Sequence, residues 1–166
     1  HTPEEDIMND MFSESARKAI EYARDEAARL RHDYIGTEHL LLGLIRLGEG
    51  MAIDMIANIG IDLVELKTSV EEVVQPSGGT MTMGQLPLTA RAKKTLEVAG
   101  QEARALKSKE IDTEHILLAL LKDEQEVKAL RLEAERALLR AQIAEARKQE
   151  QQAERGGNGD HWGADR

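Results

Sequence analysis

The chain has 166 residues, of which 41% are apolar, 32% charged and 2% aromatic, and its formal net charge is −9. This length suits one domain, or two small domains that share a core, and the scarcity of aromatic residues means that Leu, Ile, Val, Ala and Met must build that core, as suits helices. The acidic net charge argues against a nucleic-acid partner. The lack of cysteine excludes disulfides and thiolate metal sites. No apolar run approaches the ~20 residues of a membrane helix, so we expect a cytoplasmic protein without a membrane partner.

Apolar residues at helical spacing, separated by turn residues, predict a series of short helices in the first half of the chain. Ser13 is the expected N-cap of a helix that runs to about Arg31. Thr37 is the expected N-cap of a second helix, which is apolar almost all round and therefore buried. A short helix that Gly60 stops and a last helix that Asp62 caps complete a unit of four helices.

The second half of the chain repeats the first at a constant offset of 76 residues. The clearest match is the triplet Thr37-Glu38-His39, which returns as Thr113-Glu114-His115. Two unrelated helices would share their apolar period but not this polar triplet, so duplication explains the match. We therefore predict an all-α fold made of a duplicated four-helix repeat with pseudo-two-fold symmetry.

The copies diverge after Lys122, where the expected pair of short helices gives way to an uninterrupted run rich in Ala, Glu, Arg and Gln. This run predicts one long charged helix with a weak apolar stripe. It must cover the core of the second copy, because otherwise the leucines of the preceding helix would be partly exposed. The predicted organisation is repeat 1 at 9–75, a linker rich in Pro and Gly at 76–86, the first half of repeat 2 at 87–125, the long helix at 126–155 and a disordered tail at 156–166.

The inventory of catalytic motifs is thin. The sequence has no phosphate-binding GxxxxGK[ST] loop, no GxGxxG after a strand and no G-x-S-x-G nucleophile turn. His39 and His115 each follow a glutamate, but neither has the second histidine four residues on that a zinc site would need, and we expect both rings to be hydrogen-bonded at their helix starts. We therefore expect a binding domain with no catalytic residues, no cofactor and no metal.

The repeated segments also carry a family pattern. In the first copy it comprises Phe12–Lys18, Arg29–Arg46 and Gly48–Gly50, and in the second copy Leu88–Lys94 and Asp112–Leu118. Over about residues 9–122, these segments resemble the duplicated N-terminal domain of Clp proteins, and above all the ClpC branch of the AAA+ unfoldases.

The resemblance implies a domain that receives client and adaptor proteins for the AAA+ ring of a larger unfoldase, which feeds a proteolytic chamber. In ClpC members this domain is a receptor for phosphoarginine, the mark on proteins that are to be degraded. Each repeat contributes a carboxylate for the guanidinium and hydroxyl or basic groups for the phosphate. Carried over by position, the set from the first copy is Ser13, Arg17 and Glu38, and the set from the second copy is Thr89, Lys93 and Glu114.

The chemistry of these residues suits such a ligand. A hydroxyl and a cation four residues apart at a helix start converge where free backbone N–H groups and the helix dipole favour an anion. A carboxylate makes strong, charge-assisted bonds to a guanidinium. Capping alone would equally explain Ser13 and Thr89, together with Thr37 and Thr113, and the dipole alone would explain a glutamate in a first turn. The residues by themselves leave both interpretations open.

A second function remains in view. The chain would then be a non-catalytic helical interaction module, in which the helix at 126–154 is a coiled-coil or docking arm, without phosphoarginine binding.

Overall fold

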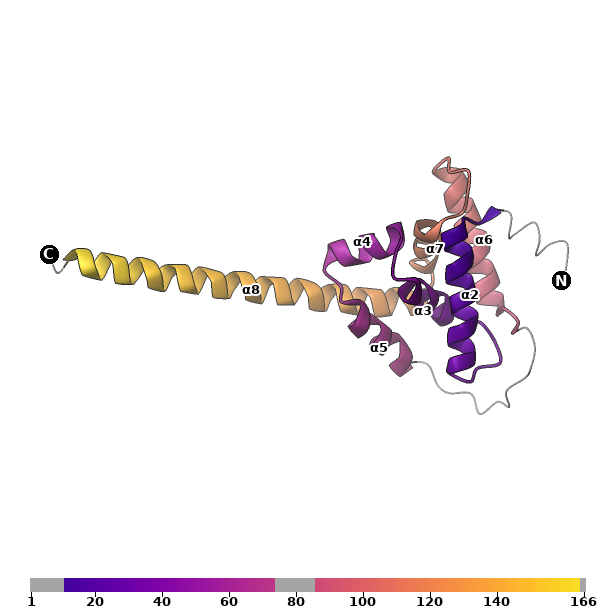
Figure 1. The fold of residues 1–166 in the computed structure, drawn as a ribbon, viewed down its shortest axis with the longest axis horizontal. Coiled ribbons are helices and arrows are strands. Elements are labelled where there is room, and N and C mark those ends of the chain that lie inside the picture. Colours follow the sequence, from indigo (N-terminus) through magenta and orange to yellow (C-terminus); the bar gives the residue numbers. More distant parts are fainter. Residues whose placement is uncertain (1–10, 74–85, 165–166) are drawn as a thin grey trace.

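The computed structural model describes residues 11–73 and 86–164. These residues form seven helices: α2 (Glu14–Arg29), α3 (Thr37–Leu47), α4 (Met51–Ile59), α5 (Leu63–Val73), α6 (Ala90–Ala105), α7 (Thr113–Leu120) and α8 (Glu124–Ala164). Helices α2 to α7 gather in one body, from which α8 extends far to one side (Figure 1). The described residues contain isolated β-bridges but no strand, so the predicted all-α class is confirmed.

Local sequence determines most of the helix ends. The hydroxyl of Ser13 accepts the N–H of Ala16 at 3.1 Å, and the hydroxyl of Thr89 accepts that of Ala92 at the same distance. These two predicted N-caps are confirmed, as is Asp62, whose carboxylate accepts the N–H of Val64 at 2.8 Å. Gly60 ends α4 in the left-handed conformation with φ 96°, the usual glycine stop.

The duplication is visible in the backbone. Segments that precede helices pair across the two copies through two isolated parallel bridges, Phe12 with Ile111 and Ile35 with Leu88. Each residue of the first bridge lies 76 positions from a residue of the second, so the two bridges are counterparts. In both, the segment before the first helix of one copy pairs with the segment before the second helix of the other copy. This reciprocal exchange gives the body its pseudo-two-fold symmetry.

Helices α2 and α3 pack unusually closely because small residues line their contact. A Cβ at Gly43 would lie 2.2 Å from the carbonyl oxygen of Ala19, so α3 approaches the α2 backbone where only glycine fits. The core that these helices share with α6 and α7 is aliphatic, as the composition predicted. Its largest fully buried apolar side chains are Ile35, Leu40, Leu41, Leu42, Leu44, Ile56, Leu66, Ile116 and Leu120.

The long helix is confirmed, but its predicted ends are wrong. It runs from Glu124 to Ala164, whereas we expected 126–155 followed by a disordered tail, so residues 156–164 are helical. Glycine weakens a helix by about 1 kcal/mol without ending it, and no proline follows Glu124 to do so. Most of the predicted linker lies at 74–85, outside the described residues. No helix in the described parts of the chain is both long and apolar enough to cross a bilayer.

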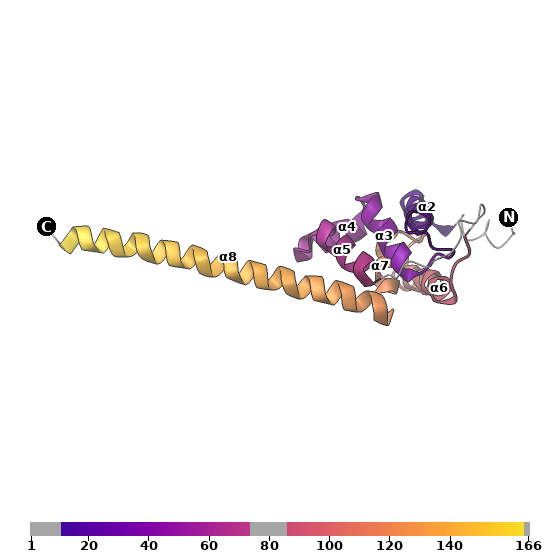
Figure 2. The same cartoon turned by 90° about the horizontal axis from the view of Figure 1, so that it is seen from below.

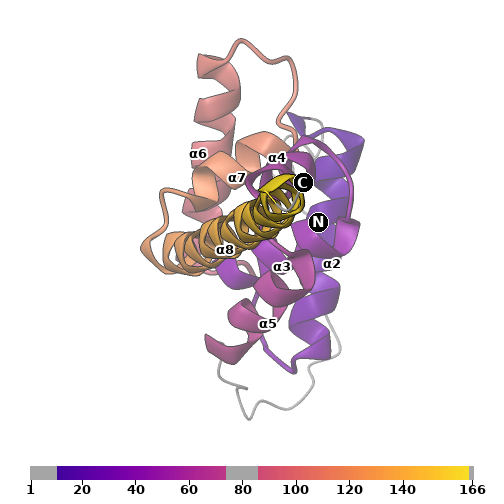
Figure 3. The same cartoon turned by 90° about the vertical axis from the view of Figure 1, so that its left-hand side faces the viewer.

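Only the start of α8 packs on the body, and the remainder extends away from it (Figure 2), toward the viewer in Figure 3. Leu130 and Ala137 are buried there, and the buried Glu133 accepts a hydrogen bond from the Ser69 hydroxyl of α5 at 2.6 Å. Every residue from 138 to 156 is exposed, so the apolar stripe expected along the whole helix is buried only in this part. The start of α8 leaves Leu117 and Leu120 buried, although Leu121 is 41% exposed.

Candidate ligand-binding sites

The backbone pairing between the copies determines which predicted site residues lie near one another. The Ser13 N–H donates to the Ile111 carbonyl at 2.9 Å, and the Ser13 hydroxyl donates to the Asp112 carboxylate at 2.8 Å. In the counterpart arrangement, the Thr89 N–H donates to the Ile35 carbonyl at 2.9 Å. The start of each first helix therefore lies beside the start of the other copy's second helix.

This geometry corrects the grouping by copy. Ser13 and Glu38 stand at the start and beyond the end of α2, whose 16 residues span about 24 Å. The fold instead places the start of α2 against the start of α7, and the start of α6 against the start of α3. We name the resulting sets the α7 site, with Ser13, Arg17 and Glu114, and the α3 site, with Thr89, Lys93 and Glu38.

Both candidate carboxylates lie in the first turn of a helix and are mostly buried. The side chains of Glu38 and Glu114 are 16% and 17% exposed. Burial together with the negative charge of Glu38 raises the pKa of the neighbouring Tyr34, and the Glu38 carboxylate also accepts a hydrogen bond from Tyr34. In the second copy a glutamate, Glu110, stands in place of this tyrosine. The Glu114 Oε2 is buried and has no hydrogen-bond partner among the described residues.

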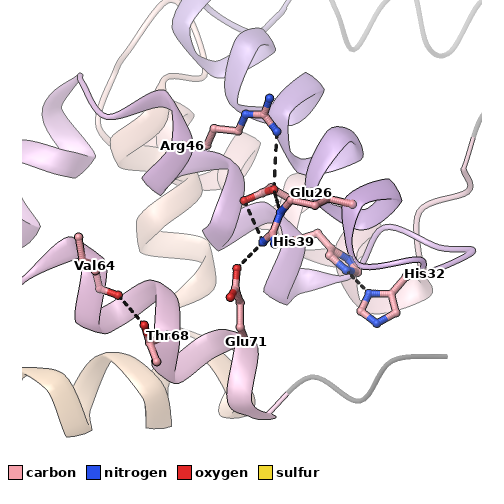
Figure 4. Close-up of polar contacts among 8 residues, drawn as sticks. Glu26, His32, His39, Arg46, Val64, Thr68 and Glu71 are labelled. Atoms are coloured by element: carbon pink, nitrogen blue, oxygen red, sulfur yellow. Dashed lines mark hydrogen bonds and ion pairs between the residues drawn. The ribbon is translucent and has the colours of Figure 1, made fainter.

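The histidine after each glutamate is structural, as expected. His39 Nδ1 accepts the N–H of Gly36 at 2.8 Å, and His115 Nδ1 accepts that of Asp112 at 2.9 Å. The His39 proton therefore lies on Nε2 and is donated to His32 at 2.7 Å (Figure 4). Burial, with a contribution from His32, lowers the pKa of His39 to about 4. His39 is thus neutral at physiological pH and does not form an ion pair with Glu38.

The two threonines before these glutamates are not N-caps, contrary to prediction. The caps are Gly36 and Asp112, and each threonine is the first residue of its helix. The Thr37 hydroxyl donates to the carboxylate of Glu126 at 3.1 Å, and the Thr113 hydroxyl accepts the N–H of Ala52 at 3.4 Å. Each hydroxyl thus binds the start of a helix of the opposite copy: Thr37 binds the start of α8, and Thr113 binds the start of α4. The pairing of segments between the copies brings these helix starts together.

The predicted cations face solvent. Arg17 and Lys93 are exposed, and neither forms an ion pair within the described residues. Arg91, which the sequence did not single out, binds both carboxylate oxygens of Asp123 at 3.0 and 2.9 Å and so ties α6 to the start of α8. Both cations of the predicted sites thus remain available to an anionic ligand.

A second set of polar residues, also missed from the sequence, links helices α2, α3 and α5. The buried Glu26 pairs with Arg29 at 2.6 Å and with Arg46 at 3.6 Å, and Arg29 also binds Glu71 (Figure 4). The second copy repeats the α2–α3 part of this arrangement as a pair between Glu102 and Lys122. The sequence did contain a signal for these ion pairs: the glutamate and the basic residue of the first copy recur 76 residues later in the second. The described residues contain no group of three side chains that could hold a metal ion.

Comparison with known proteins places this arrangement in a family. The model of the Clp repeat (R) N-terminal domain matches residues 11–134. The chain belongs to the Clp N-terminal repeat family. The match ends within the docked part of α8 and leaves out the exposed part.

Named relatives of this Clp repeat domain agree. The chain is 40% identical over 114 residues, 69% of its length, to a probable ATP-dependent Clp protease ATP-binding subunit of Chlamydia pneumoniae. It is also 40% identical over 126 residues, 76% of its length, to the chloroplastic chaperone protein ClpC of Pisum sativum. In each case it spans only 14% of the relative.

Solved structures show the same fold. The N-terminal domain of ClpD from Arabidopsis thaliana superposes with a TM-score of 0.60 at 23% identity, covering 80% of this chain and 96% of that one. The Hsp104 N-terminal domain from Candida albicans gives 0.63 at 19% identity, covering 72% and 79%. At these identities the likeness concerns the fold alone.

Proposed function

We propose that this Clp repeat domain receives client and adaptor proteins for a larger ATP-dependent unfoldase, and that it binds clients that carry phosphoarginine. One observation carries the proposal. At two related places, the start of a helix that carries a hydroxyl and an exposed cation lies beside the start of a helix from the other copy, which carries a largely buried carboxylate. The family, with the ATP-binding subunit and ClpC among its named relatives, supplies the context.

The two ends of phosphoarginine match this arrangement. The phosphate would bind the hydroxyl of Ser13 or Thr89, the free N–H groups of the first helical turn, and Arg17 or Lys93. The planar guanidinium would bind Glu114 or Glu38 through charge-assisted hydrogen bonds, which contribute on the order of 1.5 to 3 kcal/mol each. After the cost of ordering the ligand, a few such bonds correspond to roughly micromolar affinity, about −8 kcal/mol.

We assign no catalysis to this domain, and we place ATP hydrolysis in the AAA+ ring of the parent protein. Delivery of clients to that ring would make the ring and the adaptors its protein partners. The cytoplasmic location expected from composition stays a prediction, since the pea relative is chloroplastic by name.

The proposal is tested by titrating the chain with free phosphoarginine and with free arginine in a calorimeter. We expect roughly micromolar binding of phosphoarginine and much weaker binding of arginine, because arginine lacks the phosphate. The double variant Glu38→Ala/Glu114→Ala should lose the binding and keep its melting temperature almost unchanged. The matched control is Glu21→Ala/Glu97→Ala, which removes two exposed glutamates at corresponding positions of α2 and α6 and should bind normally.

Two outcomes would contradict the proposal. If the wild-type chain gives no heat with phosphoarginine, the ligand is wrong. If the Glu38→Ala/Glu114→Ala variant binds as well as the wild type, the site is wrong.

One observation favours the second candidate, a docking arm. The exposed part of α8 carries large apolar side chains, among them Leu138 at 60% and Leu139 at 57% exposure. If this part formed a coiled coil, the chain would sediment as a concentration-dependent dimer, and Leu138→Glu/Leu139→Glu would make it a monomer. A wild-type chain that is monomeric at all concentrations would contradict the arm as a dimerisation device.

A further inference from the structure

The two sites differ at the residue that precedes each helix, which is Gly36 before α3 and Asp112 before α7. The backbone is nearly the same at both positions, with φ and ψ of −101° and −178° at Gly36 and −109° and −179° at Asp112. This extended conformation does not demand glycine. The difference is therefore one of side chain alone: the α7 site has a carboxylate where the α3 site has none.

The Asp112 carboxylate is hydrogen-bonded to the Ser13 hydroxyl of the α7 site. Its Oδ1 accepts hydrogen bonds from the Ser13 hydroxyl and from the Thr113 N–H, both at 2.8 Å. A hydroxyl and a first-turn N–H are the donors that bind phosphate oxygens at a helix start. Asp112 thus stands where the phosphate would bind, and its negative charge would repel a phosphate that approached.

The obstruction is confined to the phosphate side of the α7 site. Glu114 keeps one buried carboxylate oxygen without a hydrogen-bond partner among the described residues. Arg17, four residues after Ser13 in the chain, is exposed. Removal of the Asp112 carboxylate would therefore leave a hydroxyl, a cation and a guanidinium acceptor in place.

The α3 site carries its additional carboxylate elsewhere. Within the described residues, no carboxylate accepts a hydrogen bond from the Thr89 hydroxyl. The buried Glu126 accepts a hydrogen bond from Thr37, the residue before Glu38, and the charge of Glu38 acts on Glu126. The counterpart of Glu126 in the first copy is Gly50. The additional carboxyl group of the α3 site thus lies beside Glu38, and none that the structure describes binds the Thr89 hydroxyl.

We infer that the two sites are not equivalent, and that Asp112 closes the α7 site to phosphate so that the α3 site alone binds phosphoarginine. This inference rests on the proposed function. One phosphoarginine side chain would then bind per chain, although the fold contains two copies of the unit.

The test is the stoichiometry of phosphoarginine binding to the full chain in a calorimeter. We expect one site in the wild type, two in Asp112→Gly, none in Gly36→Asp and one in the combined swap. Gly36→Asp is compatible with the backbone angles, but its Cβ would lie 2.6 to 2.8 Å from the Glu38 carboxyl group and must displace it. Gly36→Ala, which adds the same Cβ without a charge, is therefore its control. Circular dichroism melts would verify that each variant is folded.

Two single variants test the inference even if Asp112→Gly fails to fold. Glu38→Ala should reduce the affinity at least a hundredfold, and Glu114→Ala should leave it within twofold of the wild type. Two bound ligands per wild-type chain, or equal losses in these two variants, would overturn the inference and leave the proposed function standing. No binding by the wild type or by Asp112→Gly would overturn the proposed function and the inference with it.

Discussion

Glu126 is a buried acid, because the start of α8 packs onto α3. It is 4% exposed, and its carboxylate accepts a hydrogen bond from Thr37. Burial raises the pKa of Glu126 from 4.5 to about 7, with a further contribution from the charge of Glu38. Since this pKa is higher in the folded state, the contribution of Glu126 to stability is complete below pH 4.5 and is lost as the pH rises through 7.

We predict that Glu126→Gln stabilises the chain at pH 8 and has little effect at pH 4.5. The amide can still accept the Thr37 hydrogen bond but needs no buried charge, so the gain in unfolding free energy approaches about 3 kcal/mol. Urea unfolding at the two pH values measures this gain. The exposed neighbour Glu124→Gln is the control and should show no such pH dependence. Equal stabilities of the wild type and Glu126→Gln at pH 8 would disprove the raised pKa.

Helix α8 combines a packed start with an exposed remainder. The packed part supplies Leu130, Ala137 and the Glu133–Ser69 hydrogen bond, and Arg140 Nη1 lies 2.7 Å from the Glu65 carboxylate at its edge. The exposed part buries nothing in the described structure. The packed part takes the place of the two short helices that the second copy lacks, and it packs on α5 and α3 of the first copy.

We predict that two truncations of α8 have different effects. A chain ending at Gln142 keeps the packed part and should melt within about 2 °C of the full chain. A chain ending at Asp123 loses it and should melt about 10 °C lower or more, since each buried apolar side chain contributes about 1.5–3 kcal/mol. Scanning calorimetry measures both. Similar melting temperatures for the Asp123 truncation and the full chain would mean that α8 is an appendage.

At the scale of the whole molecule, the two copies are interdependent. The bridges Phe12–Ile111 and Ile35–Leu88 both run between copies, and α4 packs on α7. A separated copy would expose its half of the shared core and leave the N–H groups of Ser13 or Thr89 without their carbonyl partners. The duplicated units therefore form one cooperative body.

We predict that residues 1–75 do not fold alone. This fragment should show no cooperative thermal transition by circular dichroism, and mixing it with residues 86–166 should restore one, because each fragment completes the other's core. The uncut chain is the control. A sharp transition in the isolated first fragment would show that the copies fold independently.

The roles of residues that contact only their neighbours in the sequence could be predicted well. Ser13 and Thr89 cap helices through contacts three residues away, and Gly60 ends a helix by its own conformation. The same local patterns misled at Thr37, where a good capping residue stands one position inside the helix because its hydroxyl binds Glu126, 89 residues further on. No local signal distinguishes these two roles of a threonine.

The sequence by itself determined the helical class and the duplication, because periodicity, caps and repetition are properties of neighbouring residues. The six candidate side chains came from the family resemblance and stay a prediction. Only the tertiary structure decided which helix starts lie side by side, since Ser13 binds Asp112 across 99 positions of the chain. It also decided that Glu126 and Glu133 are buried, although both lie in a run whose composition predicts a solvated helix. The physical reason is the same in each case: packing brings together segments of the two copies, and the energy of a polar group depends on what then surrounds it.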